Sequence, residues 1–221
     1  MNKYKMLIIF FLLLSIIGIS KTYAIINNYT LLGKVIYIDP GHGGIDSGTV
    51  YKKIYEKDLN LLLAKKLEQE LVALGATVYL TRETDKDLAL TTKNRKRSDL
   101  INRAYLINKT KPDIYLSLHI NYIENSTWKG LQIFYNHKNK ENEVIAKSLT
   151  KYIKEKTTNI KDPKYDNAYY MYKHITTPGV LIEMGFLSNP DDRYRLTHEK
   201  YQDILIDNLT YSIEKYFQEK T

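Results

Sequence analysis

The chain has 221 residues, of which 43% are hydrophobic and 26% are charged, and its formal net charge is +8. This length is sufficient for one well-buried core and too short to favour two large domains, so we expect a single domain. The absence of cysteine excludes disulfides, thiolate metal sites and cysteine nucleophiles. Any bound metal must therefore be held by His, Asp or Glu.

The beginning of the chain differs from the rest. Lys3 and Lys5 precede an apolar run over residues 6–19, and a small residue, Ala24, follows at a possible cleavage point. This order is typical of a secretory signal peptide. As a helix the run would span about 21 Å, short of a hydrocarbon core of about 30 Å, which favours a cleaved signal peptide over a retained anchor. The expected division is a signal peptide or N-terminal membrane anchor over 1–24, a linker over 25–33 and one domain over 34–221.

Loss of the leader would lower the net charge from +8 to +5, because residues 1–24 contain three lysines and no acidic residue. A charge of this size is not typical of a nucleic-acid-binding domain, so we expect no nucleic-acid partner, and membrane contact only through the N-terminal segment. The densest basic stretch, residues 93–97, is interpreted as a solvated helical face. The functional alternative is attraction to a polyanionic cell envelope.

After the leader, strand-like and helix-like segments alternate, which predicts a layered α/β domain with a largely parallel sheet. Leucines at helical spacing between Glu56 and Leu74, closed by Gly75, indicate an amphipathic helix. Residues 157–177 predict a loop with a short ordered piece, and residues 189–192 predict a turn. The expected strands are 34–39, 77–81, 114–118, 130–135 and 178–186, and the expected helices are 56–74, 92–108, 140–156 and 198–217.

One loop is a candidate for chemistry. The β-forming residues 35–39 end at Pro40, and three glycines surround His42 in the next four positions. Glycines leave space beside the imidazole, which suits the approach of a metal or a substrate. A glycine turn with an incidental histidine is the alternative, since one such histidine is a weak signal.

Three more polar residues are expected at the same edge of the sheet. His119 and Glu183 each follow a predicted strand, and Glu56 opens the helix after the first strand. The carboxyl ends of parallel strands meet at one edge, which would bring these residues to His42. Two imidazoles and one carboxylate are a ligand set for catalytic zinc, and the second carboxylate would remain as a general base. Spacing does not decide which carboxylate has which role.

Each of these residues also has an ordinary explanation. Glu56 can be a first-turn glutamate favoured by the helix dipole. His119 can be a hydrogen-bonded histidine at a strand end, and Glu183 can pair with an arginine such as Arg82 or Arg103. The three other histidines lie in polar surroundings and are expected at the surface; they are His137, His174 and His198.

Five motifs occur along the chain: Asp-Pro-Gly-His-Gly-Gly at 39–44, Glu-Lys-Asp-Leu-Asn at 56–60, Thr-Arg at 81–82, Ser-Leu-His-Ile-Asn at 117–121 and Val-Leu-Ile-Glu-Met-Gly-Phe-Leu-Ser-Asn at 180–189. As a set they resemble the zinc-dependent N-acetylmuramoyl-L-alanine amidases of bacterial cell walls, from about Lys34 to the C-terminus. The short body and the Trp-Lys-Gly segment at 128–130 most resemble the germination-specific amidases of endospore formers. Those enzymes prepare spore-cortex peptidoglycan for muramic-δ-lactam formation.

The resemblance implies His42, Glu56 and His119 as ligands of one Zn²⁺ and Glu183 as the catalytic carboxylate. Arg82 and Asn121 are secondary candidates for substrate contacts. The implied fold is a single three-layer α/β domain, with a twisted, mostly parallel sheet of about six strands flanked by helices. The implied substrate is peptidoglycan, cleaved between N-acetylmuramic acid and L-alanine of the stem peptide. The expected location is extracytoplasmic, secreted or anchored at the cell envelope or forespore.

Two departures from the family pattern, Ile120 and Met184, do not touch the chemistry. Some relatives carry a helical plug between the second histidine and the final glutamate. Here that interval is 64 positions (183 − 119) and is filled by predicted elements, so control is expected elsewhere, for example from an envelope activator protein. Two alternative functions stay open: an exported zinc peptidase or carboxypeptidase, and a peptidoglycan-binding module that has lost hydrolysis.

Overall fold

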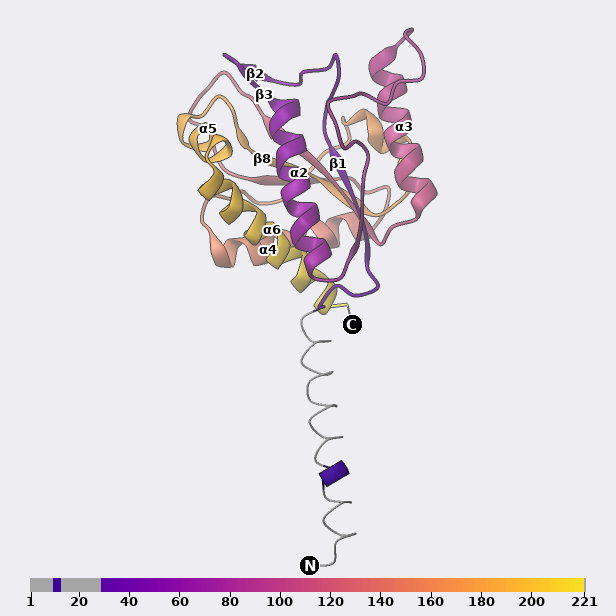
Figure 1. Ribbon diagram of the computed structural model, residues 1–221. Helices are drawn as coiled ribbons and strands as arrows, with labels where there is room; N and C mark the ends of the chain where they lie inside the picture. Colours follow the sequence, from indigo (N-terminus) through magenta and orange to yellow (C-terminus); the bar gives the residue numbers. More distant parts are fainter. Residues whose placement is uncertain (1–9, 13–28, 221) are drawn as a thin grey trace, which may run out of the picture.

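The computed structural model describes residues 10–12 and 29–220 (Figure 1). The expected leader over 1–24 lies outside these residues except for 10–12, and the expected linker over 25–33 is described at 29–33. Within the described ranges no helix has the length and apolar character needed to cross a membrane.

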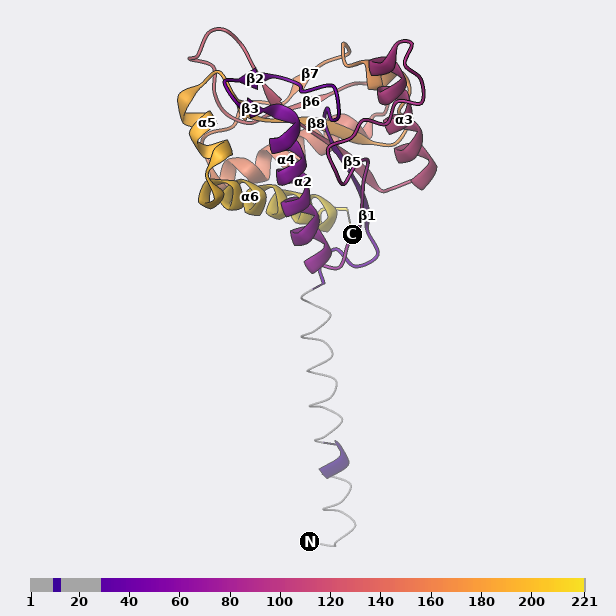
Figure 2. The ribbon, with the colours of Figure 1, turned by 45° about the horizontal axis from the view of Figure 1, so that its top comes forward.

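A six-stranded sheet forms the middle of the domain, in the order β4-β1-β5-β8-β6-β7. The first four strands are parallel, β6 is antiparallel to β8, and β7 is parallel to β6. The strands of the sheet are β1 (Val35–Pro40), β4 (Thr77–Leu80), β5 (Ile114–Asn121), β6 (Gln132–Tyr135), β7 (Lys164–Tyr165) and β8 (Gly179–Phe186). A separate hairpin of β2 (Val50–Tyr51) and β3 (Ile54–Tyr55) lies above the first turn of α2 (Figure 2).

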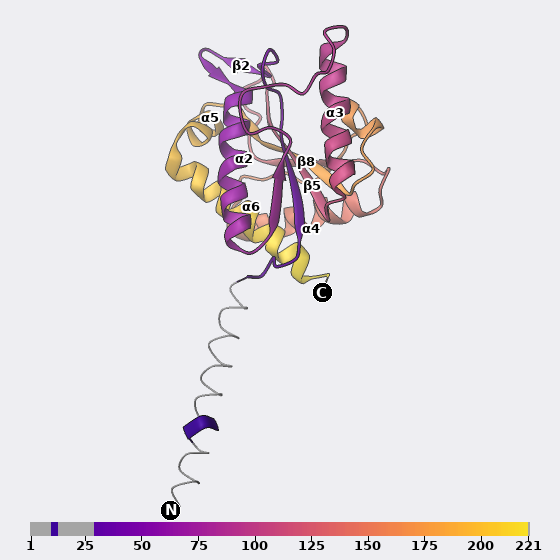
Figure 3. The same ribbon diagram turned by 45° about the vertical axis from the view of Figure 1, so that its right-hand side comes forward.

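Helices cover both faces of the sheet and give three layers (Figure 3). One face carries α2 (Glu56–Ala73), α4 (Glu141–Lys156) and α6 (Glu199–Gln218), which enclose the larger core. The other face carries α3 (Arg95–Thr110) and the 3₁₀ helix η1 (Tyr170–Lys173), which enclose a smaller core. This arrangement confirms the expected single α/β domain with a mostly parallel, six-stranded sheet.

The alternation of side chains along the central strands decides which residues can reach the site. In β5, Leu116 and Leu118 belong to the larger core, whereas Tyr115 belongs to the smaller core on the α3 side. The same period of two places His119 on the α3 side, where it pairs in register with Glu183 of β8. The smaller helical layer therefore leaves the strand ends on this side free for polar groups.

A fully buried carboxylate, Asp39, lies at the end of β1 on the same side. It accepts hydrogen bonds from Thr81 Oγ1 at 2.7 Å, from Ser117 Oγ at 2.7 Å and from Arg103 Nη1 at 2.8 Å. Burial raises the pKa of Asp39, but Arg103 and the two hydroxyls outweigh this effect and hold the pKa below its ordinary value. The carboxylate is therefore ionised and compensated inside the protein.

Arg103 extends this network to the loop after β1. Its Nε donates to Asp99 at 2.8 Å, and its other nitrogens donate to the carbonyl oxygens of Pro40 at 2.8 Å and His42 at 2.6 Å. The guanidinium thus joins α3, β1 and the histidine loop through one buried group.

Two local expectations were incomplete. Residues 189–192 form not an isolated turn but the start of α5 (Pro190–Thr197), because the Asn189 side chain accepts the Asp192 N–H at 3.0 Å and caps the helix. The helix expected from 92 begins at Arg95, after Asn94 in a left-handed conformation with φ of 55°. The β2–β3 hairpin was not predicted.

The network generates a stability prediction. Replacement of Arg103→Met leaves Asp39 and Asp99 buried without their cation, and should lower the free energy of unfolding by about 3–5 kcal/mol. Arg95→Met is the matched control, because Arg95 pairs with Asp87 at 3.0 Å but is 40% exposed, and it should cost less than about 1 kcal/mol. Urea unfolding measures both; equal losses would contradict the role assigned to the buried pair.

Candidate metal centre

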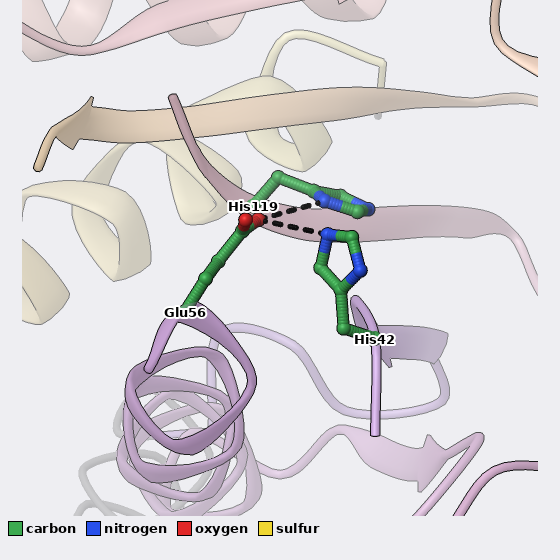
Figure 4. A group of neighbouring side chains, drawn as sticks. All are labelled: His42, Glu56 and His119. Atoms are coloured by element: carbon green, nitrogen blue, oxygen red, sulfur yellow. Dashed lines mark hydrogen bonds and ion pairs between the residues drawn. The ribbon is translucent and has the colours of Figure 1, made fainter. Parts of the chain in front are cut away.

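Three of the predicted site residues converge on one point (Figure 4). His42 comes from the loop after β1, Glu56 from the first turn of α2 and His119 from β5. His42 Nε2 and His119 Nδ1 each lie 3.1 Å from the same oxygen, Oε1 of Glu56. One ligand atom from each of the three residues lies within 4.8 Å of the others, so this cluster can hold a metal ion.

Glycines make this convergence possible. A side chain at Gly41 would place its Cβ 2.3 Å from the His119 ring, and one at Gly48 would place it 2.6 Å from Glu56 Oε2 and 2.7 Å from the His42 ring. Gly48 also has a φ of +62°. His42 itself adopts a left-handed φ of 63°, an uncommon conformation for a residue with a side chain. The Arg103 bond to its carbonyl oxygen holds the loop in this form.

The backbone fixes both oxygens of Glu56. Oε1 accepts the Ile120 N–H at 3.0 Å, and Oε2 accepts the Thr49 N–H at 2.8 Å. Asn60, one turn further along α2, donates to the Gly41 carbonyl oxygen at 3.2 Å. Asn60 Nδ2 also donates to Glu56 Oε1 at 3.4 Å. The carboxylate is therefore oriented by the segment before β2, by β5 and by α2 itself.

The cluster is strongly coupled electrostatically. Burial lowers the pKa of His42, but its contacts with Asp46 and Glu56 outweigh this and raise the pKa to about 9. Burial raises the pKa of Glu56, but the two histidines outweigh this and hold it well below its ordinary value. The raised pKa of His42 and the lowered pKa of Glu56 favour an ion pair between these two side chains.

The donor set fits zinc. Tetrahedral ligands about 2.0–2.1 Å from Zn²⁺ are separated from one another by about 3.3 Å, and the two His–Glu distances of 3.1 Å are close to this value. Two imidazoles and one carboxylate are also the ligand types that catalytic zinc uses. The residues present therefore fit a zinc site in chemistry, and the two His–Glu pairs fit it in spacing.

Glu183 lies in the same pocket as the cluster, an open hollow of about 360 Å³. Its Oε2 is buried and has no hydrogen-bond partner among the described residues. Burial, followed by the charge of Glu56, raises the pKa of Glu183 to about 8. The alternative of an arginine partner does not apply, because Arg103 is bonded to Asp39 and Asp99, and Arg82 to backbone carbonyl oxygens.

The remaining candidates have different surroundings. Asn121 lines the pocket. Arg82 is 1% exposed, and its guanidinium donates to the carbonyl oxygens of Pro40, Gly41, Thr84 and Lys57, which is a position inside the loop framework. The three other histidines are exposed, as expected.

Two pocket residues were not recognised from the sequence. Asp46 Oδ2 lies 3.0 Å from His42 Nδ1 as an ion pair, and Lys96 Nζ lies 3.3 Å from the same Asp46 oxygen. An acid beside the outer nitrogen of a metal-ligating histidine fixes the orientation of the ring. The four-residue spacing from His42 was the available signal for Asp46, whereas the approach of Lys96 depends on the path of the long loop before α3.

Gly48→Ala tests the space that the cluster needs. The new methyl group would displace Glu56 and His42, so zinc affinity should fall about 10–100-fold. Gly33→Ala is the matched control, because Gly33 has a φ of +79° with nothing within 4 Å of an added Cβ. The Gly33→Ala variant carries the same backbone strain and should keep wild-type zinc affinity. Competition with a chelating dye measures the zinc affinity of both variants. Equal affinity in the two variants would contradict the steric argument.

The family profile described as N-acetylmuramoyl-L-alanine amidase matches residues 36–215. The germination-specific N-acetylmuramoyl-L-alanine amidase of Bacillus subtilis is 42% identical over 195 residues, which cover 86% of this chain and 82% of that protein. The probable cell wall amidase LytH of Staphylococcus aureus is 32% identical over 191 residues, which cover 85% of this chain and 60% of LytH.

Solved structures of amidases are similar to this chain in fold. The CwlD amidase of Clostridioides difficile, solved in complex with the GerS lipoprotein, has a TM-score of 0.77 and 32% identity, covering 85% of this chain and all of that one (100%). The catalytic domain of CwlV, from Bacillus (Paenibacillus) polymyxa, has a TM-score of 0.73 and 29% identity, covering 84% and 98%. The match over most of the chain, together with the fold, shows that this protein belongs to the N-acetylmuramoyl-L-alanine amidase family and acts on peptidoglycan.

Proposed function

We propose that His42, Glu56 and His119 bind one Zn²⁺, and that Glu183 moves the protons when the amide between N-acetylmuramic acid and L-alanine is hydrolysed. The observation that carries this assignment is the contrast between the two glutamates. Both oxygens of Glu56 are engaged by backbone N–H groups beside the histidines. Glu183 instead has a buried oxygen without a partner in the described structure, in the same pocket.

When bound, zinc would lower the pKa of a water molecule and polarise the scissile carbonyl group. Glu183 would accept a proton from the attacking water, whose oxygen bonds to the carbonyl carbon. As the C–N bond breaks, the same carboxyl group would give this proton to the departing nitrogen of L-alanine. The products are a carboxylate on the lactyl group of muramic acid and a free amino terminus on the stem peptide.

The glutamate roles can be separated by two substitutions. Glu183→Gln keeps the shape of the pocket and should retain about one zinc per chain while lowering kcat by about 10²–10⁴-fold, the usual contribution of a general acid–base group. Glu56→Gln should lose zinc and activity together. Metal analysis and mass spectrometry of digested muropeptides measure the two quantities. Loss of zinc from Glu183→Gln with retention by Glu56→Gln would reverse the assignment.

The muropeptide products also test the alternative functions. An exported zinc peptidase or carboxypeptidase would release amino acids, and a silent binding module would release nothing. The amidase assignment requires intact stem peptides that begin with L-alanine. Membership of the amidase family and the complete cluster favour this outcome.

We further propose that the chain is exported through its N-terminal segment and acts in the maturation of spore cortex. The similarity to the germination-specific amidase of Bacillus subtilis supports this role. An envelope activator is also proposed, because a similar amidase was solved with a lipoprotein. In the interval between His119 and Glu183, the described elements belong to the sheet and its covering layers, which supports control by a separate protein.

Deletion of the gene should leave spores whose cortex lacks muramic-δ-lactam, and Glu183→Gln should not restore it. Mass spectrometry of cortex muropeptides measures the lactam directly. Normal lactam content in the deleted strain would contradict the cortex role without affecting the amidase assignment. Full activity of the purified protein on denuded cortex glycan with zinc alone would contradict an obligatory activator.

A further inference from the structure

The pocket around the metal centre is rich in carboxylates, and the start of α3 supplies a cation at its mouth. Asp46, Glu56 and Glu183 all line the pocket. Among the described residues that line it, Lys96 is the one lysine or arginine. Its side chain is 69% exposed, and its Nζ lies 3.3 Å from Asp46. A side chain this exposed can turn from Asp46 towards a ligand at little cost.

The same segment also contributes to a second hollow, of about 310 Å³. Lys93 and Arg97 line it on either side of Lys96 in sequence, and Tyr170 lines it from η1. The Arg97 guanidinium lies 5.6 Å from the centre of the Tyr170 ring, and Lys173 Nζ lies 5.5 Å from the same ring. The second hollow therefore has basic and aromatic residues in its lining, and Lys96, between Lys93 and Arg97 in sequence, lines the pocket of the metal centre.

These lysines and this arginine differ from Arg95 in the same segment. Arg95 is bound to Asp87 by two hydrogen bonds of 3.0 and 3.2 Å. Lys93 and Arg97 are exposed, and the first turn of the described helix α3 contains no acidic residue. The helix dipole adds partial positive charge to this end. We call Lys93, Lys96 and Arg97 the α3 edge.

We propose that the α3 edge binds the carboxylates of the stem peptide and so gives the enzyme a preference for stem peptides with free carboxylates. This inference rests on the proposed function, because it places L-alanine of the substrate at the metal centre. The next residue of a stem peptide is glutamate joined through its γ-carboxyl group, which leaves its α-carboxylate free. That carboxylate meets Lys96, and carboxylates further along the peptide meet Lys93 and Arg97.

Asp46, Glu56 and Glu183 place negative charge around the pocket, and Lys96 places positive charge on one side of it. Such surface charges act mainly on association rate and specificity, and their effect is screened by salt.

The test compares two muropeptides that differ at one group, the α-carboxylate or α-carboxamide of the second residue. The zinc-loaded wild-type protein should cleave the carboxylate form with a kcat/KM about 5-fold higher, a difference that shrinks in high salt. Lys96→Ala should lose this preference, so that its kcat/KM is the same for the two forms. Lys96→Arg should restore it. Lys200→Ala, which removes an exposed lysine at the start of α6, is the matched control and should keep it.

Zinc content separates this effect from a disturbance of His42 through Asp46, and Lys96→Ala should retain one zinc per chain. Binding of the free stem peptide, followed by nuclear magnetic resonance shifts, reports on the edge without any cleavage. A preference that persists in Lys96→Ala and in the combined Lys93→Ala, Lys96→Ala, Arg97→Ala variant would overturn the proposal, as would stem-peptide binding unchanged by these substitutions. A different result would overturn the proposed function alone: neither muropeptide is cleaved, but the free stem peptide still binds and its binding is weakened by the substitutions in the α3 edge.

Discussion

The carboxylate of Glu56 contacts every segment that forms the metal centre. Its Oε1 faces both histidines and accepts a backbone N–H from β5, while Oε2 accepts one from the segment before β2. A glutamate in the first turn of a helix has an ordinary electrostatic explanation, but here the same group joins α2, the β1 loop and β5. Removal of any one of these connections would leave a buried charge incompletely compensated.

Much of this arrangement could be predicted from the sequence, because strand ends in a parallel sheet share one edge. His42 follows β1 and His119 lies near the end of the neighbouring β5, and the register places Glu183 beside His119. The roles of the two glutamates could not be separated by spacing, since they differ in hydrogen-bond partners rather than in position along the chain. The sequence also suggests Arg82 as a substrate contact, but in the structure its guanidinium donates hydrogen bonds to backbone carbonyl oxygens around the histidine loop. Such side-chain burial depends on contacts between distant segments, which local patterns do not encode.

The two faces of the sheet have different roles: one buries most of the apolar side chains, and the other holds the buried charged groups. The larger core on the α2, α4 and α6 side is apolar and supplies most of the burial. The α3 side carries the buried ions, because Asp39 and Arg103 lie directly under the loop that presents His42. A buried ion pair is seldom a strong source of stability, but it is well suited to fix one geometry. Here that geometry includes a histidine in a left-handed conformation.

The short β2–β3 hairpin has a further consequence. It is only two residues per strand, and besides the Thr49 bond to Glu56 it leans on α5, where the Arg193 guanidinium lies 3.8 Å from the centre of the Tyr51 ring. Small elements of this kind open more readily than core strands. Opening would free one oxygen of Glu56, so docking of the hairpin and occupancy of the site are linked equilibria that strengthen each other.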